Sequence, residues 1–460
     1  MPEVNFPSDW VFCSISDIAQ VNPKKIDAEP DTVSGFVPMS LAPVSFSDSF
    51  RYEEKYWKEI NKSYTNFQNG DVIFAKVTPC FENGKAAIAD GLPNGIGAGS
   101  SEFYVLRPHT PHVLPDILFA LIKTQKFAND GVANMTGAVG LRRVPRAFVE
   151  SFDAPMIPIA EQKVIAEKLG TLLAQVEATK VRLENTLETL KQFRQSVLAA
   201  AVSGKLTEDW RKSNRVESGY RSITLGDVIN DGPQNGIYKP STLYGSGTKI
   251  IRIDGFYDGE LCSWESFKRV NVDQEEAEKW ALKENDILIN RVNSIEYLGK
   301  CGLVRTLPET AIFESNIMRV SIDENKARPE FIKIFLTSPK GLDSLRANAK
   351  LAVNQASINQ QDVKSCPLDL PETNEQREII RKVNLLLSGA DSTELLVNQA
   401  LERVNNLTQS ILAKAFRGEL TEQWRKENPE LISGDNSAEA LLAKIKAERE
   451  TVKPKRKTKK

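Results

Sequence analysis

Few residue patterns in this 460-residue chain have the spacing that catalysis requires. The glycine-rich run Gly95–Ser101 has Ser100 where a dinucleotide-binding fingerprint needs its third glycine, and no strand–helix–strand pattern surrounds it. The run Asn83-Gly84-Lys85 contains the Gly-Lys pair of a phosphate-binding loop, but it lacks the earlier glycine and the following serine or threonine. Neither run is expected to bind a nucleotide.

The pair Glu161 and Lys163 looks like a fragment of a nuclease site, yet Glu375 and Arg377 hold the same places in a second copy of the sequence. Because both pairs stand at the start of a predicted helix, a capping or helix-dipole role is the better interpretation. The five cysteines have no CxxC spacing, and no Asn/Asp-Pro-Pro-Tyr/Phe motif of amino-methyltransferases occurs. We therefore predict no catalytic residue and no metal site.

An internal duplication dominates the chain. Residues 161–212 recur without a gap at 375–426, and the two copies end in QSVLAAAVSGKLTEDWRK and QSILAKAFRGELTEQWRK. The regions before them share an order too, since DVIFAKV from Asp71 matches DILINRV from Asp286. A unit of about 214 residues is therefore present twice, with a pseudo-twofold arrangement as the expected result.

Each copy also contains a heptad pattern. Apolar residues step by four and three alternately over 165–197 and 379–411, with charged residues between them and no proline. Gly204 and Gly418 follow as C-terminal stops. Each copy therefore predicts a helix of about 38 residues, roughly 57 Å long. Because a long helix with one apolar stripe needs a partner, we expect the two helices to pair antiparallel.

The segments before the helices are predicted to be globular. They contain short β-like runs, such as 72–74 and 103–106, and an apolar helix candidate over 114–123. We predict an α+β fold in which two α/β domains are separated by two long antiparallel coiled-coil helices. The predicted boundaries are 1–157 for the first domain, 158–205 for the first helix, 206–218 for a connector, 219–370 for the second domain, 371–418 for the second helix and 419–460 for a C-terminal segment with a basic tail.

Composition places the chain among ordinary globular proteins. It is 41% hydrophobic and 26% charged, with no apolar stretch of membrane-spanning length and no basic start followed by an apolar run, so we expect a soluble, cytoplasmic protein without a membrane partner. The formal net charge of −1 conceals nine basic and two acidic residues within 444–460. The end of this tail, VKPKRKTKK, is interpreted as either a disordered arm that touches phosphates or a solubilising end.

Three motifs are typical of one known family: AEQKVIAEKLGTLLAQV from Ala160, the paired GKLTEDWRK and GELTEQWRK segments, and LERVNNLTQSILAKAFRGELTEQWR from Leu401. Through them the chain resembles, over nearly its whole length, the DNA-specificity subunit of a type I restriction-modification enzyme, in the IA-like group with central and C-terminal repeats. The runs DVIFAKVTPCFENGK from Asp71 and NDILINRVNSIEYLGKCGLV from Asn285 look like target recognition domains of that family.

This resemblance implies a non-catalytic subunit whose two target recognition domains read the two halves of a split, asymmetric site in double-stranded DNA, while the paired helices set the gap. It also implies two modification subunits, which carry S-adenosylmethionine and methylate adenine, and two restriction subunits. S-adenosylmethionine, ATP and Mg would belong to those partners, with no cofactor on this chain. Two alternatives stay open: a methyltransferase or nuclease that acts by itself, and a coiled-coil adaptor that binds no DNA.

Side chains that pair with base edges or phosphates must lie on the groove-facing surface of each domain. Lys76 and Arg291 are equivalent in the duplication and head the two candidate sets. In the first domain we expect DNA contacts from Lys76, Thr78, Lys85, Ser100, Ser101, Arg142, Arg143 and Arg146. In the second domain we expect them from Asn290, Arg291, Asn293, Lys300, Asn316, Asn354, Gln355, Asn359 and Gln360.

Overall fold

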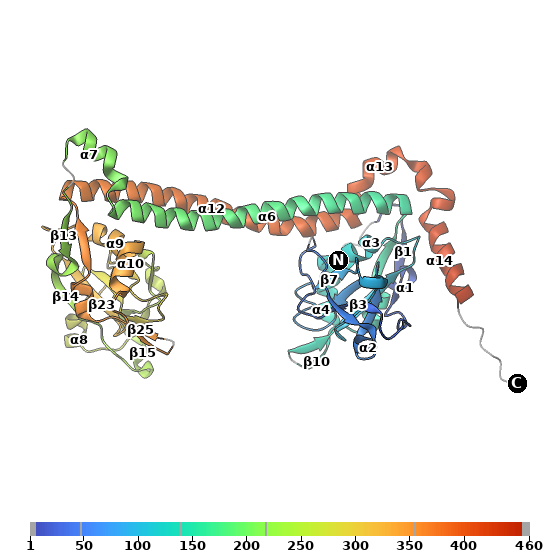
Figure 1. Ribbon diagram of the computed structural model, residues 1–460, viewed down its shortest axis with the longest axis horizontal. Coiled ribbons are helices and arrows are strands. Elements are labelled where there is room, and N and C mark those ends of the chain that lie inside the picture. Colours follow the sequence, from blue (N-terminus) through green and yellow to red (C-terminus); the bar gives the residue numbers. More distant parts are fainter. Residues whose placement is uncertain (1–5, 47, 139, 217–218, 354, 453–460) are drawn as a thin grey trace. The chain divides into compact units, whose positions relative to one another are not determined.

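The chain divides into two compact units, Met1–Glu184 with Gln399–Lys460, and Asn185–Asn398. The computed structural model describes residues 6–46, 48–138, 140–216, 219–353 and 355–452. Figure 1 shows that each unit contains a globular domain and part of each of the two long helices. Unit 2 begins within the first long helix and ends within the second, so each unit includes one end of both helices.

Two four-stranded sheets form the globular domain of unit 1, with the orders β2-β9-β6-β7 and β4-β3-β8-β5. Their strands are β2 (Ala19–Val21), β3 (Val33–Val37), β4 (Glu53–Tyr56), β5 (Thr65–Gln68), β6 (Val72–Ala75), β7 (Ala86–Ile88), β8 (Ile96–Gly99) and β9 (Phe103–Pro108). The strands predicted over 72–74 and 103–106 are confirmed as parts of β6 and β9. β1 (Val11–Ser14) pairs with β12 (Asp153–Met156), and β10 (Thr136–Ala138) forms a separate antiparallel ribbon with β11 (Leu141–Arg143).

Short helices cover the sheets of unit 1. They are α1 (Ile15–Ile18), α2 (Trp57–Ile60), α3 (Pro115–Ile122), α4 (Gln125–Asn134) and α5 (Arg146–Ser151). The helix predicted over 114–123 is confirmed as α3, whose apolar residues are buried against the sheet. The same core takes in α14 (Ala438–Val452), through Leu441, Leu442 and Ile445. The C-terminal segment therefore packs on the first domain as far as this helix, while the basic residues 453–460 lie outside the described part of the chain.

Unit 2 has more strands in its largest sheet, which has the order β14-β23-β19-β21-β17-β16. Its strands are β14 (Ile229–Asn235), β16 (Phe256–Tyr257), β17 (Gly259–Leu261), β19 (Ile287–Asn290), β21 (Cys301–Leu303) and β23 (Ile317–Ile322). Two smaller sheets have the orders β18-β15-β22 and β20-β25-β24, and β13 pairs with β26. Their strands are β13 (Arg221–Thr224), β15 (Tyr244–Ile251), β18 (Lys268–Val270), β20 (Val292–Asn293), β22 (Ala311–Phe313), β24 (Lys350–Ala352), β25 (Gln355–Ser357) and β26 (Pro367–Leu370).

The short helices of unit 2 are α7 (Glu208–Asn214), α8 (Gln274–Lys279), α9 (Pro329–Thr337), α10 (Pro339–Arg346) and α11 (Gln360–Lys364). Of these, α8 to α11 follow the order of α2 to α5 in unit 1, while α7 corresponds to α13 (Glu422–Glu427). Buried side chains of α9 pack against the largest sheet, as those of α3 do in unit 1. The duplication seen in the sequence is thus a duplication of the fold.

The two long helices are α6 (Ile159–Val202) and α12 (Thr373–Phe416), each 44 residues long. They exceed the predicted 38 residues because their first and last turns, outside the heptad pattern, are buried in the cores of the globular domains, as Ala201 and Val202 show. Gly204 and Gly418 follow in the left-handed conformation, with φ of 78° and 71°, as the expected stops.

Contacts inside each unit show that the long helices run antiparallel. In unit 1, Lys168 near the start of α6 donates to the carbonyl of Leu420, just beyond the end of α12. In unit 2, Arg194 near the end of α6 forms ion pairs of 2.6 Å with Asp391 and Glu394 of α12. No helix in the described ranges is long and apolar enough to cross a membrane.

Candidate nucleic-acid interface

Lys76 and Arg291 occupy equivalent positions directly after β6 and β19. The amide of Lys76 donates to the carbonyl of Glu102 at 2.9 Å, and the amide of Arg291 donates to that of Asn316 at 2.9 Å. Their own carbonyls accept hydrogen bonds, at 2.8 and 2.9 Å, from the residues that follow β11 and β25. The duplicated backbone therefore places a cation beside the ribbon β10–β11 in unit 1 and beside the ribbon β24–β25 in unit 2.

In unit 1 this ribbon brings five of the predicted residues together. The amides of Thr78 and Arg142 each donate across the gap, to the Arg142 carbonyl and to Thr78 Oγ1 respectively, both at 3.0 Å. The ammonium of Lys76 donates to the carbonyl of Ser101 at 2.8 Å. Arg143 follows Arg142 in β11. We call this set, Lys76, Thr78, Ser101, Arg142 and Arg143, the ribbon surface of unit 1.

Carboxylates already pair with both arginines of the ribbon surface. Arg143 binds Glu102 through two hydrogen bonds of 2.9 and 2.8 Å, and Arg142 binds Glu82 at 3.3 Å. The hydrogen bonds from Arg143 hold the pKa of the Glu102 carboxyl below its ordinary value. Glu102 is therefore ionised at neutral pH, and Arg143 reaches a DNA phosphate only by exchanging one anion for another.

The other predicted residues of unit 1 have different partners. Ser100 Oγ accepts from the amide of Glu102 at 3.2 Å, next to the ribbon surface. Arg146, in the first turn of α5, pairs with Glu150 at 2.7 Å and donates to the carbonyl of Val21 at 3.0 Å. Its charge supports α5 and the neighbouring strand β2.

In unit 2 the structure separates Asn290 from Arg291. Asn290 is fully buried, and its Nδ2 donates to the carbonyl of Ile253 at 3.3 Å, so the expectation that it lies on the groove-facing surface is not met. Arg291 is half-buried and donates to the carbonyl of Ser315 at 3.1 Å. All four residues of β19 are buried, so both faces of this strand are covered. Its sequence therefore shows no alternation of apolar and polar residues from which an outward-facing side chain could be predicted.

Three further residues of the second set lie close to Arg291 along the chain or the sheet. Asn293 belongs to β20, which pairs with β25, and β25 begins with Gln355. Asn316 accepts from the Arg291 amide through its carbonyl, as described above. The ribbon β24–β25 thus gathers Arg291, Asn293 and Gln355 in unit 2.

The remaining residues of that set have separate environments. Lys300 Nζ lies 4.9 and 4.2 Å from the ring centres of Tyr257 and Tyr297, a cation–π arrangement on the surface. Asn359 caps α11, since its side chain accepts from two backbone amides at 2.7 and 3.1 Å. Gln360 is exposed at the start of that helix, and Asn354 lies outside the described residues.

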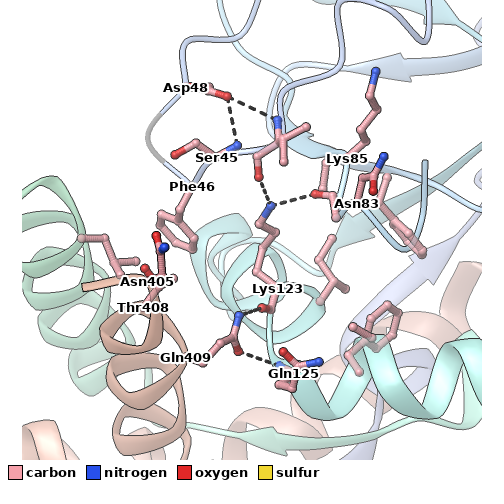
Figure 2. Close-up of a pocket in the computed structure, with 18 of the residues that line it drawn as sticks. Ser45, Phe46, Asp48, Asn83, Lys85, Lys123, Gln125, Asn405, Thr408 and Gln409 are labelled. Atoms are coloured by element: carbon pink, nitrogen blue, oxygen red, sulfur yellow. Dashed lines mark hydrogen bonds between the residues drawn. The ribbon is translucent and has the colours of Figure 1, made fainter. Parts of the chain in front are cut away.

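A pocket of ≈ 590 Å³ in unit 1 lies between the globular domain and the helix pair (Figure 2). Lys123 extends into it and donates to the carbonyls of Val44 and Gly84 at 2.6 and 2.7 Å. Burial lowers the pKa of Lys123 to about 8. Lys85 also lines the pocket and donates to the carbonyl of Met39 at 2.7 Å. Both amines therefore hold loops of the domain in place.

Glu161 proves to be a junction residue. Its buried carboxylate accepts hydrogen bonds from Trp10 Nε1 at 2.8 Å, Thr421 Oγ1 at 2.6 Å and Arg425 at 2.5 Å. These donors come from the N-terminal segment and from the GELTEQWRK motif. The partners of Glu161 are thus side chains distant in sequence, and the capping role expected for it is replaced by a link between both ends of unit 1.

The duplicate carboxylate, Glu375, forms the corresponding junction in unit 2. It accepts from Thr207 Oγ1 at 2.6 Å and from the Tyr220 hydroxyl at 2.9 Å, and it pairs with Arg211. Thr207 and Arg211 belong to GKLTEDWRK. The Thr and Arg of the repeated motif therefore bind the buried Glu at the start of the other long helix in each unit. The sequence analysis did not predict this link. The sequence did contain a sign of it, because the Glu and the Thr-x-x-x-Arg pattern both recur in the second copy at the same spacing.

Three of the five cysteines, Cys13, Cys301 and Cys366, are buried. Burial raises the pKa of the Cys13 and Cys301 thiols to about 12 and that of Cys366 to about 11, so these cysteines stay protonated. Within the described part of the chain, no group of three or more His, Cys, Asp or Glu side chains could hold a metal ion. Each copy of the fold thus presents one surface that contains a two-stranded ribbon and a basic residue beside it.

Comparison with known proteins agrees with this arrangement. The family model described as the type I restriction modification DNA specificity domain matches residues 7–189 and 217–403. The specificity subunit of the type I restriction enzyme EcoKI from Escherichia coli K12 is 40% identical over 347 residues, which cover 75% of this chain and 74% of that protein. The EcoDI specificity subunit of E. coli is 38% identical, with 96% of both chains covered.

Solved structures show the same fold. A chain from a study of complex assembly in a type I restriction-modification system aligns with a TM-score of 0.73 at 19% identity, covering 90% of this chain and 99% of that one. The HsdS subunit of Thermoanaerobacter tengcongensis aligns with a TM-score of 0.59 at 19% identity, covering 91% of this chain and 99% of that one. The matched residues and the identity to these relatives show that this chain belongs to the family of type I restriction-modification DNA specificity subunits.

Proposed function

We propose that this chain, as a non-catalytic specificity subunit, recognises a split and asymmetric DNA site with one half read by each globular domain. The observation that supports this proposal is the difference between the two copies at equivalent positions. The backbone around Lys76 and Arg291 is the same, whereas Arg142 and Arg143 of one ribbon correspond to Ala356 and Ser357 of the other. A scaffold that keeps its geometry and changes its polar side chains is suited to reading two different sequences.

Membership of the family supports a proposal about partners. The two junctions share the hydrogen bond from a Thr to a buried Glu, which is Glu161 in unit 1 and Glu375 in unit 2. At each junction, several residues of the repeated motif are exposed to solvent. We propose that two modification subunits bind these repeated regions, one for each, and that two restriction subunits complete the complex. S-adenosylmethionine, ATP and Mg would then be bound by those subunits. The complex would act on chromosomal and invading DNA in the cytoplasm, directing adenine methylation and restriction.

The long helices would determine the gap between the two half-sites. In each unit the helix ends are fixed to a globular core, with Leu169 and Ala201 buried there at 1% and 0% exposure. If each recognition domain is joined rigidly to a helix end, the length of the helix determines where that domain contacts the DNA. We therefore propose a fixed spacer between the half-sites.

The experiment is to map methylated adenines in the source genome and in a strain that lacks this chain. The proposal predicts one bipartite motif, with a fixed spacer and one methylated adenine in each half, that loses its methylation in the deletion strain and regains it on complementation. An unchanged methylome, or a lost motif without two separated halves, would refute the proposal. Complementation with a Glu161→Gln and Glu375→Gln double variant tests the junctions in the same assay, and reduced methylation of the same motif is expected.

A further inference from the structure

Both ribbons carry large apolar side chains in the solvent. Leu141 in β11 is 53% exposed, and Leu351 and Val353 at β24 are 75% and 91% exposed. Single exposed apolar residues are common on protein surfaces, but here the duplicated ribbon carries them in both copies, at different positions of the ribbon. Side chains that are this exposed contribute little to folding, so their position on duplicated ribbons points to a ligand.

Cationic side chains flank these apolar residues, and in unit 1 the two arginines are paired with Glu82 and Glu102. Leu141 precedes Arg142 and Arg143, and the ribbon is tied to the end of β6 by the hydrogen bonds between Thr78 and Arg142. Leu351 follows Lys350, and β25 pairs with the strand that begins directly after Arg291. Figure 1 shows β10 projecting from the body of unit 1. An apolar tip flanked by cations is complementary to a surface with apolar groups between rows of phosphates.

The major groove of B-DNA is such a surface. It is about 12 Å wide and admits a two-stranded β-ribbon, and its walls are lined by phosphates. Among the four bases, only thymine presents an apolar group there, the 5-methyl group. Apolar side chains discriminate thymine by contact with this methyl, while neighbouring cations bind phosphates and purine edges.

We propose that the two ribbons enter the major groove, one in each half-site, and that Leu141 in unit 1 and Leu351 with Val353 in unit 2 contact thymine methyl groups. This inference rests on the proposed function and adds the side chains that read part of the sequence. Arg142 and Lys350 hold the ribbons against the phosphates.

The two ribbons place their leucines differently, which gives the two domains different preferences. Leu141 lies opposite Ala138 in unit 1, whereas Leu351 lies opposite Ala356 in unit 2. Gly137 stands at the position that corresponds to Leu351, and its φ of +123° with the Leu141 carbonyl 2.7 Å from an added Cβ excludes a larger residue. The leucine therefore contacts the groove from the second strand in one copy and from the first strand in the other.

The test uses the purified complex of this chain with its modification subunits and duplexes of the mapped target. Thymines are replaced one at a time by uracil, which lacks only the methyl group. Each half-site should contain at least one position where uracil weakens binding about four-fold, the size expected for one buried methyl. In Leu141→Ala that effect should disappear from one half only, and in the Leu351→Ala, Val353→Ala double variant from the other half only.

Val44→Ala removes an apolar side chain that is 49% exposed elsewhere in unit 1, and it should leave every uracil effect unchanged. Thermal unfolding of each variant separates a misfolded ribbon from a lost contact, and each variant should still bind the all-uracil target as the wild type does. Uracil at all positions without any loss of affinity would overturn the inference, as would uracil effects that persist in the leucine variants. A wild-type complex that fails to bind the mapped site would instead overturn the proposed function on which the inference rests.

Discussion

Glu161 Oε1 accepts a hydrogen bond from Thr421 Oγ1 at 2.6 Å, although 260 residues separate the two in the chain. Glu375 accepts one of the same length from Thr207 in the second copy. Because these carboxylates are buried and paired with an arginine, each fastens the beginning of one long helix to the segment that follows the end of the other. The repeated motif is therefore a structural joint of each unit.

Glu161→Ala should destabilise unit 1 and leave unit 2 unaffected. Removal of one partner of a buried ion pair leaves Arg425 without its carboxylate, at a cost of about 3 kcal/mol. Hydrogen exchange of amides in the two units measures this, with faster exchange expected in α13 (Glu422–Glu427) and in the start of α6. Glu422→Ala removes an exposed i,i+4 partner of Lys426 and serves as the control without effect. Equal exchange in Glu161→Ala and the wild type would show that the joint is dispensable.

Lys123 should make the free energy of unfolding of unit 1 depend on pH in the alkaline range. Burial lowers its pKa from 10.5 to about 8, so between these values the unfolded chain binds more protons than the folded one. Stability should therefore rise with pH across this window, by up to about 3 kcal/mol relative to Lys123→Met. Unfolding midpoints of the two proteins from pH 7.5 to 10.5 provide the measurement. Lys163→Met, at an exposed position of α6, is the control, and parallel pH profiles for wild type and Lys123→Met would refute the assignment.

Glu102→Gln should strengthen non-specific DNA binding by the first domain. The variant removes the negative charge and one of the two acceptor oxygens that hold Arg143, so its guanidinium is freer to bind a phosphate. The slope of log affinity against log salt concentration should become steeper by about one unit. Glu208→Gln, which releases Lys212 in unit 2, is the matched control with an unchanged slope. An unchanged slope in Glu102→Gln would place Arg143 away from DNA.

Arg291→Ala should weaken binding in the second half of the target. If its guanidinium grips a guanine, the variant loses about 1 to 3 kcal/mol and relaxes one position of the recognised sequence. A uniform loss over all sequences, with a shallower salt slope, would mark a phosphate contact. Lys76→Ala is the equivalent change in the first domain, and binding that is unaltered in both variants would remove these residues from the interface.

Much of this fold could be predicted because its main signals are periodic or repeated. The heptad pattern and the gapless duplication specify α6 and α12, and short apolar runs specify β6 and β9. The ribbons escaped prediction, since β10 and β11 are three-residue strands with an exposed surface that no apolar alternation marks. The docking of α14 on the first domain escaped it too, because long-range packing leaves no local trace in sequence.

The candidate site could be predicted only in part, for a similar reason. Choosing polar residues after matched strands found Lys76 and Arg291, whose backbone contacts are the same in both units. The same choice included Asn290, which is buried. The sequence of a strand that is covered on both faces does not show which side chains point inward and which outward. The choice also omitted Leu141 and Leu351, because the search considered hydrogen-bonding groups alone.

The central claim is that each globular domain reads one half of the DNA site, and exchange of one domain tests it most directly. The exchanged part should include residues 1–157 and 419–460 of another specificity subunit, because Leu441 and Ile445 belong to the core of the first domain. Methylated adenines are then mapped in cells that express the chimera with the modification subunits. We predict a new sequence in one half of the motif, the 5′ half if the family's order holds, with the other half and the spacer unchanged. A motif altered in both halves would contradict independent reading by the two domains.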